Sequence, residues 1–244
     1  MKNYIPLFLI ALLIWSCKRG PAIDMTEEEI DAYVQTCVSP DRVYDIGLGL
    51  RYSRDDESYQ VTEYTYNDSL ILHNIEEISM EHSRRRNIFY KNNLPVYLED
   101  YLFEYGDSLK ITERKVYLTG DGLLAAYERS GESELAVEGF KFHKVDMKFK
   151  DFDFQRPKDA MLQKGEFEMK FGEFLIINPE SYLILENDKS EFGVALFILE
   201  GDLLLDELYE HPKEYKGKTI FVQHEFMNMN GIERMIYRGG IVKE

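Results

Sequence analysis

A short pattern that returns four times in the middle of the chain constrains its fold most. Each copy has a strand end, three of them closing on a tyrosine, followed by a polar turn and then a leucine. The copies begin at Tyr66, Tyr90, Tyr105 and Leu118. Between the turns, apolar or β-branched residues alternate with polar ones, which is the period of a half-buried strand. Asn, Asp and Gly supply the positive φ angles of tight hairpins. The pattern predicts an antiparallel β-meander over residues 59–129, and its uneven spacing argues against a solenoid.

A short helix is expected before the meander. Thr26 and Glu29 have the spacing of a capping box, and the glutamates after Thr26 suit the positive end of a helix. Five apolar positions then follow helical spacing on one face. They are Ile30, Tyr33, Val34, Cys37 and Val38. Ser39-Pro40 ends the pattern, so we predict an amphipathic helix packed on the sheet.

Beyond the meander, phenylalanines in residues 130–164 predict further strand, interrupted by charges. A turn or linker is expected at residues 156–159, around Pro157. The predicted domains are therefore a helix-plus-meander domain over residues 25–155 and a β-rich C-terminal module over residues 160–244.

The C-terminal module has a different order of predicted elements. Strand-like runs are followed by a helical stretch at Leu203–Tyr209 and then by two more strands. The three runs before the helix cover residues 166–177, 181–186 and 192–199, and the two after it are 219–225 and 232–238. This order, with Tyr215-Lys216-Gly217-Lys218 before the fourth strand, resembles an OB-type barrel, and a plain half of a β-sandwich is the alternative. The predicted fold class is thus mainly β: a short N-terminal helix, an antiparallel meander, and a smaller barrel-like module with one helix.

Charge excludes several classes of partner. The chain of 244 residues holds 29 Lys and Arg against 45 Asp and Glu, a formal net charge of −16. Such a chain repels phosphates, so we expect no nucleic-acid partner and no general binding to anionic lipid. Its two cysteines cannot form a disulfide framework or a cysteine-rich zinc site.

The first residues resemble a targeting signal. Lys2 precedes an apolar stretch over residues 4–15, and a helix of that length rises only about 18 Å, too short to cross a bilayer. This is typical of a secretory signal peptide. Ile14-Trp15-Ser16-Cys17 then resembles the lipobox of bacterial lipoproteins. The resemblance implies removal of residues 1–16, acylation of Cys17, and a tether over residues 17–24. Lys18 after the cysteine favours the outer membrane, and we expect a periplasm-facing protein of the cell envelope.

Residues that could carry chemistry do not form a known catalytic pattern. The five histidines, at positions 73, 82, 143, 211 and 224, have no zinc-hydrolase spacing, and neither a nucleophile elbow nor a phosphate-binding loop is present. We therefore assign no catalytic residue, no metal ligand and no cofactor. Asp151 and Asp153, like Asp55-Asp56-Glu57, are interpreted as solvated charges, and Cys37 as a small buried side chain.

One basic cluster remains as a candidate binding site. Arg84, Arg85 and Arg86 are consecutive, and guanidinium groups suit carboxylates, phosphates or sulfates. The alternative is a segment that offsets nearby acids such as Glu77. The sequence thus predicts a membrane-anchored, non-enzymatic lipoprotein that binds an envelope protein or component. A carrier of a lipid or hydrophobic ligand, and an envelope hydrolase with an unrecognised Asp/Glu site, are the alternatives; the ligand itself is not predicted.

Overall fold

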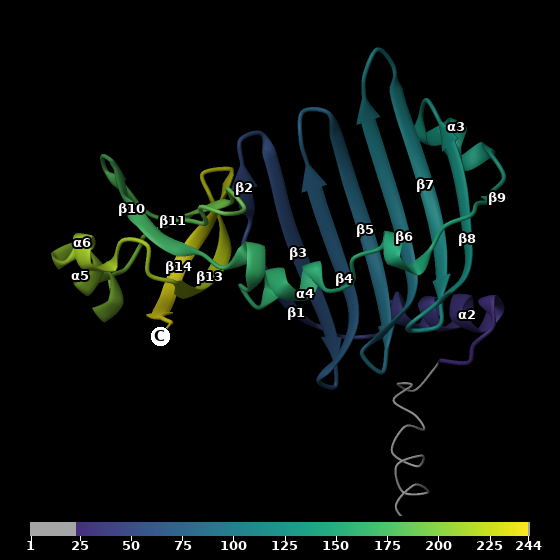
Figure 1. Cartoon of the computed structure of the whole chain (residues 1–244), viewed down its shortest axis with the longest axis horizontal. Helices are drawn as coiled ribbons and strands as arrows, with labels where there is room; N and C mark the ends of the chain where they lie inside the picture. The colour runs from purple at the N-terminus through teal and green to yellow at the C-terminus, as the bar shows by residue number, and fades with distance from the viewer. Residues whose placement is uncertain (1–22, 244) are drawn as a thin grey trace, which may run out of the picture.

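The computed structural model describes residues 23–243, and its centre is the predicted meander (Figure 1). Six consecutive antiparallel strands are joined by short hairpins. They are β3 (Glu57–Tyr66), β4 (Ser69–Ile78), β5 (His82–Lys91), β6 (Leu94–Tyr105), β7 (Leu109–Leu118) and β8 (Leu123–Gly131). Asn67 and Asp68, and likewise Asn92 and Asn93, all have positive φ angles between 50° and 62°. The meander and the chemistry of these two turns are therefore confirmed.

Strand alternation gives the meander two apolar faces. On one face Ile88, Leu98 and Val116 are cross-strand neighbours, and all three are buried. Their chain neighbours Phe89, Tyr97 and Tyr117 align in the same way on the other face. Because successive side chains point to opposite sides of a strand, each face needs its own cover. We call the first face the strap face and the second the helix face, after the elements that cover them.

The predicted helix is confirmed as α2 (Glu27–Cys37), and it covers part of the helix face. The Thr26 hydroxyl accepts the Glu29 N–H, and the Glu29 carboxylate accepts the Thr26 N–H at 2.8 Å, so the capping box is complete. Ile30, Val34 and Cys37 are buried in the same cluster as Phe89, Tyr97 and Tyr117. The stripe of apolar residues thus fixes which side of the helix meets the sheet.

The strap face is crossed by residues 145–161, which we call the strap. The chain reaches it through β8, α3 (Glu134–Gly139) and β9 (His143–Lys144). The strap holds a 3-10 turn at Phe149–Asp151 and the helix α4 (Arg156–Met161). Its apolar side chains, Phe149, Phe152 and Phe154 among them, pack against the core of the strap face. The expectation of further strand over residues 130–164 was wrong apart from the last two residues of β8 and the two of β9. The expected turn at 156–159 is the start of α4.

The C-terminal module follows the predicted order of strands, with two helices in place of one. A 3-10 turn at Gly165–Phe167 precedes it. Its elements are β10 (Lys170–Ile177), β11 (Glu180–Glu186), β12 (Gly193–Phe197), α5 (Leu203–Glu210), α6 (Pro212–Tyr215), β13 (Ile220–Met229) and β14 (Ile232–Val242). β12 pairs in parallel with β14 at Phe197 and Ile236, and β13 pairs with β14. The Phe171 N–H donates to the Lys218 carbonyl at 2.9 Å. The segment that leads into β13 therefore lies beside the start of β10. The module is barrel-like, and its strand order is consistent with the OB-type arrangement.

Two short strands join the module to the meander. β1 (Asp45–Leu48) pairs with β3, and β2 (Tyr52–Arg54) lies between β3 and β12. The ring of Phe167 stacks on Tyr59 with centroids 5.0 Å apart and lies 5.5 Å from Phe192. One apolar core therefore runs from the meander into the module, while the predicted domain boundaries stay a prediction. Within residues 23–243 no helix is long and apolar enough to cross a membrane.

Candidate functional site

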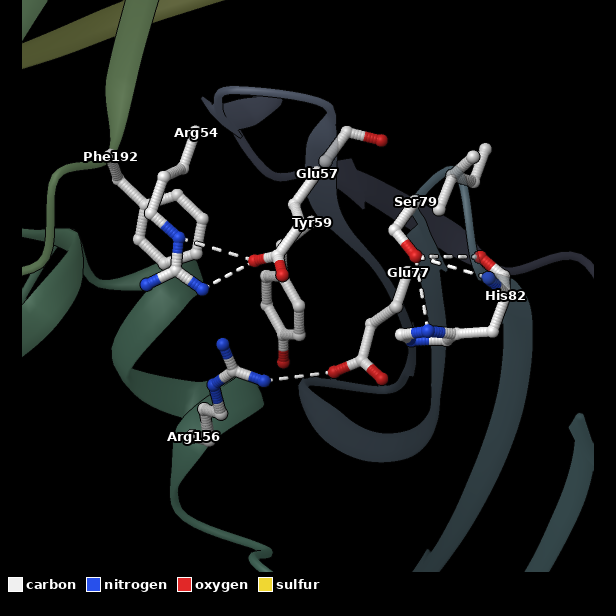
Figure 2. A pocket seen from close by; sticks show the side chains of 10 residues that line it. Arg54, Glu57, Tyr59, Glu77, Ser79, His82, Arg156 and Phe192 are labelled. Carbon is white, nitrogen blue, oxygen red and sulfur yellow. Dashed lines mark hydrogen bonds and ion pairs between the residues drawn. The ribbon is translucent and has the colours of Figure 1, made fainter. Parts of the chain in front are cut away.

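A polar pocket of about 190 Å³ opens where the meander, the strap and the C-terminal module meet (Figure 2). We call it the junction pocket. It brings together residues that are far apart in the sequence. Its walls are Arg54, Glu57, Ser58, Tyr59, Glu77, Ile78, Ser79, His82, Arg156 and Phe192.

Arg156 is placed by the strap. It is the first residue of α4, and its backbone N–H is held at 3.0 Å by the carboxylate of Asp153. Its guanidinium donates to Glu77 at 2.8 Å and to Glu166 at 2.7 Å. The same group lies over the Tyr59 ring, 4.4 Å from the centroid. Two carboxylates and one ring therefore fix the position of this charge.

Arg54, on another wall of the pocket, also lies over an aromatic ring and pairs with a carboxylate. It ends β2, and its guanidinium carbon lies 5.2 Å from the centroid of the Phe192 ring. It also pairs with Glu57 across the β2–β3 turn and donates to the Ser190 carbonyl at 3.3 Å. The pocket thus presents two guanidinium groups, each resting on an aromatic ring and each beside a carboxylate (Figure 2).

Ser79 and His82 form the third wall, in the hairpin between β4 and β5. The Ser79 hydroxyl lies 3.0 Å from Nδ1 of His82 and also accepts the His82 backbone N–H at 3.1 Å. Both contacts are local bonds of one four-residue turn, so they explain how the turn is held. His82 also lines a broader, open hollow of about 580 Å³ along the tips of the β4–β5 and β6–β7 hairpins.

The predicted arginine cluster is divided between the two faces of β5. Arg84 and Arg86 point to the strap face, whereas Arg85 lies on the helix face with its guanidinium 5.1 Å from the Tyr101 ring centroid. Arg86 pairs with Glu77 at 2.6 Å, so Glu77 holds both Arg86 and Arg156. The three consecutive arginines therefore do not make a single basic patch.

Arg84 belongs to a chain of ion pairs that runs across the strap face away from the pocket. It binds Asp100 with two hydrogen bonds of 2.6 and 2.7 Å, and the Asp100 side chain is only 1% exposed. Arg114 adds a third contact to Asp100 at 3.3 Å and binds Glu128 at 2.6 Å. Buried carboxylates need this degree of pairing because their desolvation is costly.

The other residues considered from the sequence have local roles. The Asp151 carboxylate accepts the Lys148 N–H at 2.8 Å, and Asp153 holds the start of α4. Asp56 accepts the Met80 N–H at 2.9 Å. Cys37 is buried where α2 packs on the helix face. Cys17 lies outside the described residues. Between residues 23 and 243, no group of His, Cys, Asp and Glu side chains is placed to hold a metal ion.

Size and charge define what the junction pocket can bind. Sites for small organic ligands usually enclose roughly 300–1,000 Å³. A pocket of about 190 Å³ suits one or two side chains of a partner better. A partner group that both donates and accepts hydrogen bonds can replace one member of the pairs Arg54–Glu57 and Arg156–Glu77. Burial raises the pKa of Tyr59 above its ordinary value, which is already well above neutral pH, so its phenol is a neutral group in the pocket.

The sequence pointed to only part of this site. Glu77 was noted as an acid that offsets the arginines and Glu57 as part of a run of solvated charges, while Arg54 and Arg156 carried no local signal of a site. The chain matches no family model, and neither the curated proteins nor the solved structures include one detectably similar to it.

Proposed function

We propose that the chain is a membrane-anchored, non-enzymatic lipoprotein of the bacterial cell envelope that binds a protein partner at the junction pocket. Acyl chains on Cys17 hold it in the outer membrane, facing the periplasm. The observation that carries the binding role is the pair of guanidinium groups of Arg54 and Arg156, each stacked on a ring at the rim of one small pocket.

The start of the described chain supports a protein held close to the membrane. Ile23 is 8% exposed, and its N–H donates to the Thr119 carbonyl at 3.2 Å. Ile23 follows Cys17 by only six positions in the sequence. Since a residue spans at most about 3.6 Å, an acylated Cys17 keeps this attachment point within about 22 Å of the membrane surface. The end of the meander near α2 then faces the bilayer.

The pocket supports recognition of side chains on a partner. Stacking on Phe192 and Tyr59 restrains the two guanidinium groups before any ligand arrives, which lowers the entropy cost of binding. Arginine and aromatic residues are also the side chains that most often dominate protein interfaces. A partner carboxylate or backbone amide that enters the pocket displaces Glu57 or Glu77 from part of their present bonding.

The anchor is tested by the intact mass of the membrane-extracted protein, measured beside a Cys17→Ala variant. We expect a mature mass that begins at Cys17 and includes acyl chains, and we expect the variant to lose it. An unacylated wild-type protein would remove the lipoprotein proposal while leaving the pocket untested by that result.

The pocket is tested separately by photo-crosslinking in cells. A benzoylphenylalanine at Ser58, inside the junction pocket, should capture a specific protein. The same probe at Glu132, an exposed residue that follows β8 at the opposite lateral edge of the meander, is the matched control. Addition of Arg156→Met to the Ser58 probe should abolish the adduct. An adduct of equal yield at both positions, or one that survives Arg156→Met, would overturn the assignment of this pocket.

A further inference from the structure

An apolar groove of about 190 Å³ lies at the outer end of the C-terminal module, away from the junction pocket. It runs between the β10–β11 hairpin, the end of β12 and the helix α5. Phe174, Ile176, Ile198, Leu205 and Tyr209 provide its apolar walls. Ile176 is 60% exposed and Tyr209 66% exposed. Figure 1 shows β10, β11 and α5 at the end of the molecule farthest from α2.

The groove borders an open strand edge. β10 is a terminal strand in the sheet order. Among residues 23–243, its second edge is paired only near its start, where Lys170 and Phe171 contact the residues just before β13. From Glu173 to Ile177 it pairs with β11 alone, as far as residues 23–243 are concerned. An unpaired edge with free N–H and C=O groups can accept another strand unless charge or a cover prevents it.

The segments that build this end of the module are strongly acidic. Residues 171–212 contain ten Asp and Glu residues and a single Lys or Arg, Lys189. Asp206 lies in the groove itself. Glu180 is neutralised by Arg234 at 2.7 Å and Asp188 by Lys170 at 3.4 Å, so most of the negative charge stays uncompensated.

We infer that this end of the module adds an extended segment of a partner protein as a further strand on β10, a segment with apolar side chains at every second position and basic residues at its ends. Every second side chain of such a strand points toward Ile176 and Tyr209 in the groove. The basic ends meet the acidic surroundings. A second copy of this acidic chain and an anionic lipid surface are both disfavoured by the same charge. The inference does not depend on the lipid anchor or on the junction pocket.

The test uses the full chain purified in a neutral detergent, which does not require acylation, and a fluorescent peptide. The peptide alternates valine and threonine and carries two lysines at each end. Binding is followed by anisotropy, with protein-free detergent as background. We expect saturable binding that weakens by at least about tenfold when the lysines are replaced by glutamates, since several charge contacts are reversed. Added salt should weaken the binding too.

Two further tests ask whether binding requires the groove and whether it requires the free edge of β10. Ile176→Ser should weaken binding at least about tenfold, since it removes an apolar wall. Ile232→Ser, at a position that is 59% exposed on β14, is the matched control and should leave binding unchanged. A peptide N-methylated at every residue between its lysines has no backbone N–H left on either edge to donate to β10, and it should not bind.

Each other outcome overturns the inference. Equal binding of the lysine and glutamate peptides removes the charge argument, and equal effects of Ile176→Ser and Ile232→Ser remove the groove. Full binding of the methylated peptide removes strand addition. Absent peptide binding together with an Ile176-dependent dimer in sedimentation assigns the surface to a second copy. Absent peptide binding together with Ile176-dependent binding of the chain to phosphatidylglycerol vesicles assigns the surface to lipid.

Discussion

The guanidinium carbon of Arg156 lies 4.4 Å from the centroid of the Tyr59 ring. This contact joins the strap to the meander, because Arg156 begins α4 and Tyr59 belongs to β3. Glu77 on β4 accepts a hydrogen bond from the same group, and Phe167 stacks on the Tyr59 ring. One side chain therefore connects the polar pocket above the core to the aromatic cluster inside it.

Replacement of Arg156 should destabilise the protein through this connection. Arg156→Ala removes two charge-assisted hydrogen bonds and the stacking on Tyr59, for an expected loss of about 2–3 kcal/mol in the free energy of unfolding. Arg156→Lys keeps the charge but loses the planar fork, so we expect about half of that loss. Urea unfolding followed by circular dichroism measures both. Lys150→Ala, an exposed position on the strap, is the control. The role of Arg156 is refuted if both alanine variants lose the same amount.

The ion pairs of the strap face should differ in value according to their burial. Asp100→Ala leaves Arg84 and Arg114 without their shared, 1% exposed partner. Breaking a buried pair from one side costs about 3–5 kcal/mol. Glu104→Ala breaks an exposed pair with Lys110, for which less than about 1 kcal/mol is expected. Both changes lie on β6, so the same denaturation series compares them. Similar losses for the two variants would contradict the burial argument.

The features predicted correctly from the sequence are those that local chemistry decides. Asn92 and Asn93 adopt positive φ angles because the tight turn requires them, and no distant residue is involved. The capping box of Thr26 and Glu29 closes over three residues. The order of elements after residue 166 also follows from local hydrophobic period. Such signals are complete within a few residues of the chain.

The strap was missed because its phenylalanines mimic a strand. Phe152 and Phe154 alternate with charges, yet a strand also needs a neighbour. β8 is paired at its outer edge with only the two residues of β9. The carboxylates of Asp151 and Asp153 bind nearby backbone N–H groups instead, which turns the chain. The junction pocket was missed for a related reason, since Glu77 and Arg156 meet across 79 positions of sequence.

Gly49, which lies beside the strap, should not tolerate even a methyl side chain. A Cβ on Gly49 would lie 2.9 Å from the Val61 carbonyl oxygen and 3.0 Å from Sδ of Met161. The Gly49 N–H also donates to that same carbonyl at 2.8 Å, so the backbone cannot move away freely. We expect Gly49→Ala to lower the free energy of unfolding by about 1–3 kcal/mol. Gly201→Ala, where a Cβ meets no atom within 4 Å, should be neutral or slightly stabilising. Thermal unfolding of the two variants in parallel decides between them.

His224 on β13 makes stability depend on pH. Burial lowers its pKa, although a hydrogen bond with the backbone of Gly49 acts in the opposite direction. Its Nε2 is buried and has no hydrogen-bond partner among the described residues. A charged imidazole at this position would therefore lack a partner for its second N–H, and the neutral ring is favoured in the folded protein.

The sign of the effect follows from proton uptake. An unfolded histidine has a pKa of about 6.5, so between that value and the lower folded pKa the unfolded state binds more protons. The contribution of His224 to stability is therefore fully present above about pH 6.5 and is lost as the pH falls through this window. We expect the wild-type free energy of unfolding to drop more between pH 7.5 and 5.5 than that of His224→Gln. His211→Gln, at an exposed position, should keep the wild-type slope. Parallel pH profiles for the wild type and His224→Gln would show that the buried imidazole does not titrate in this window.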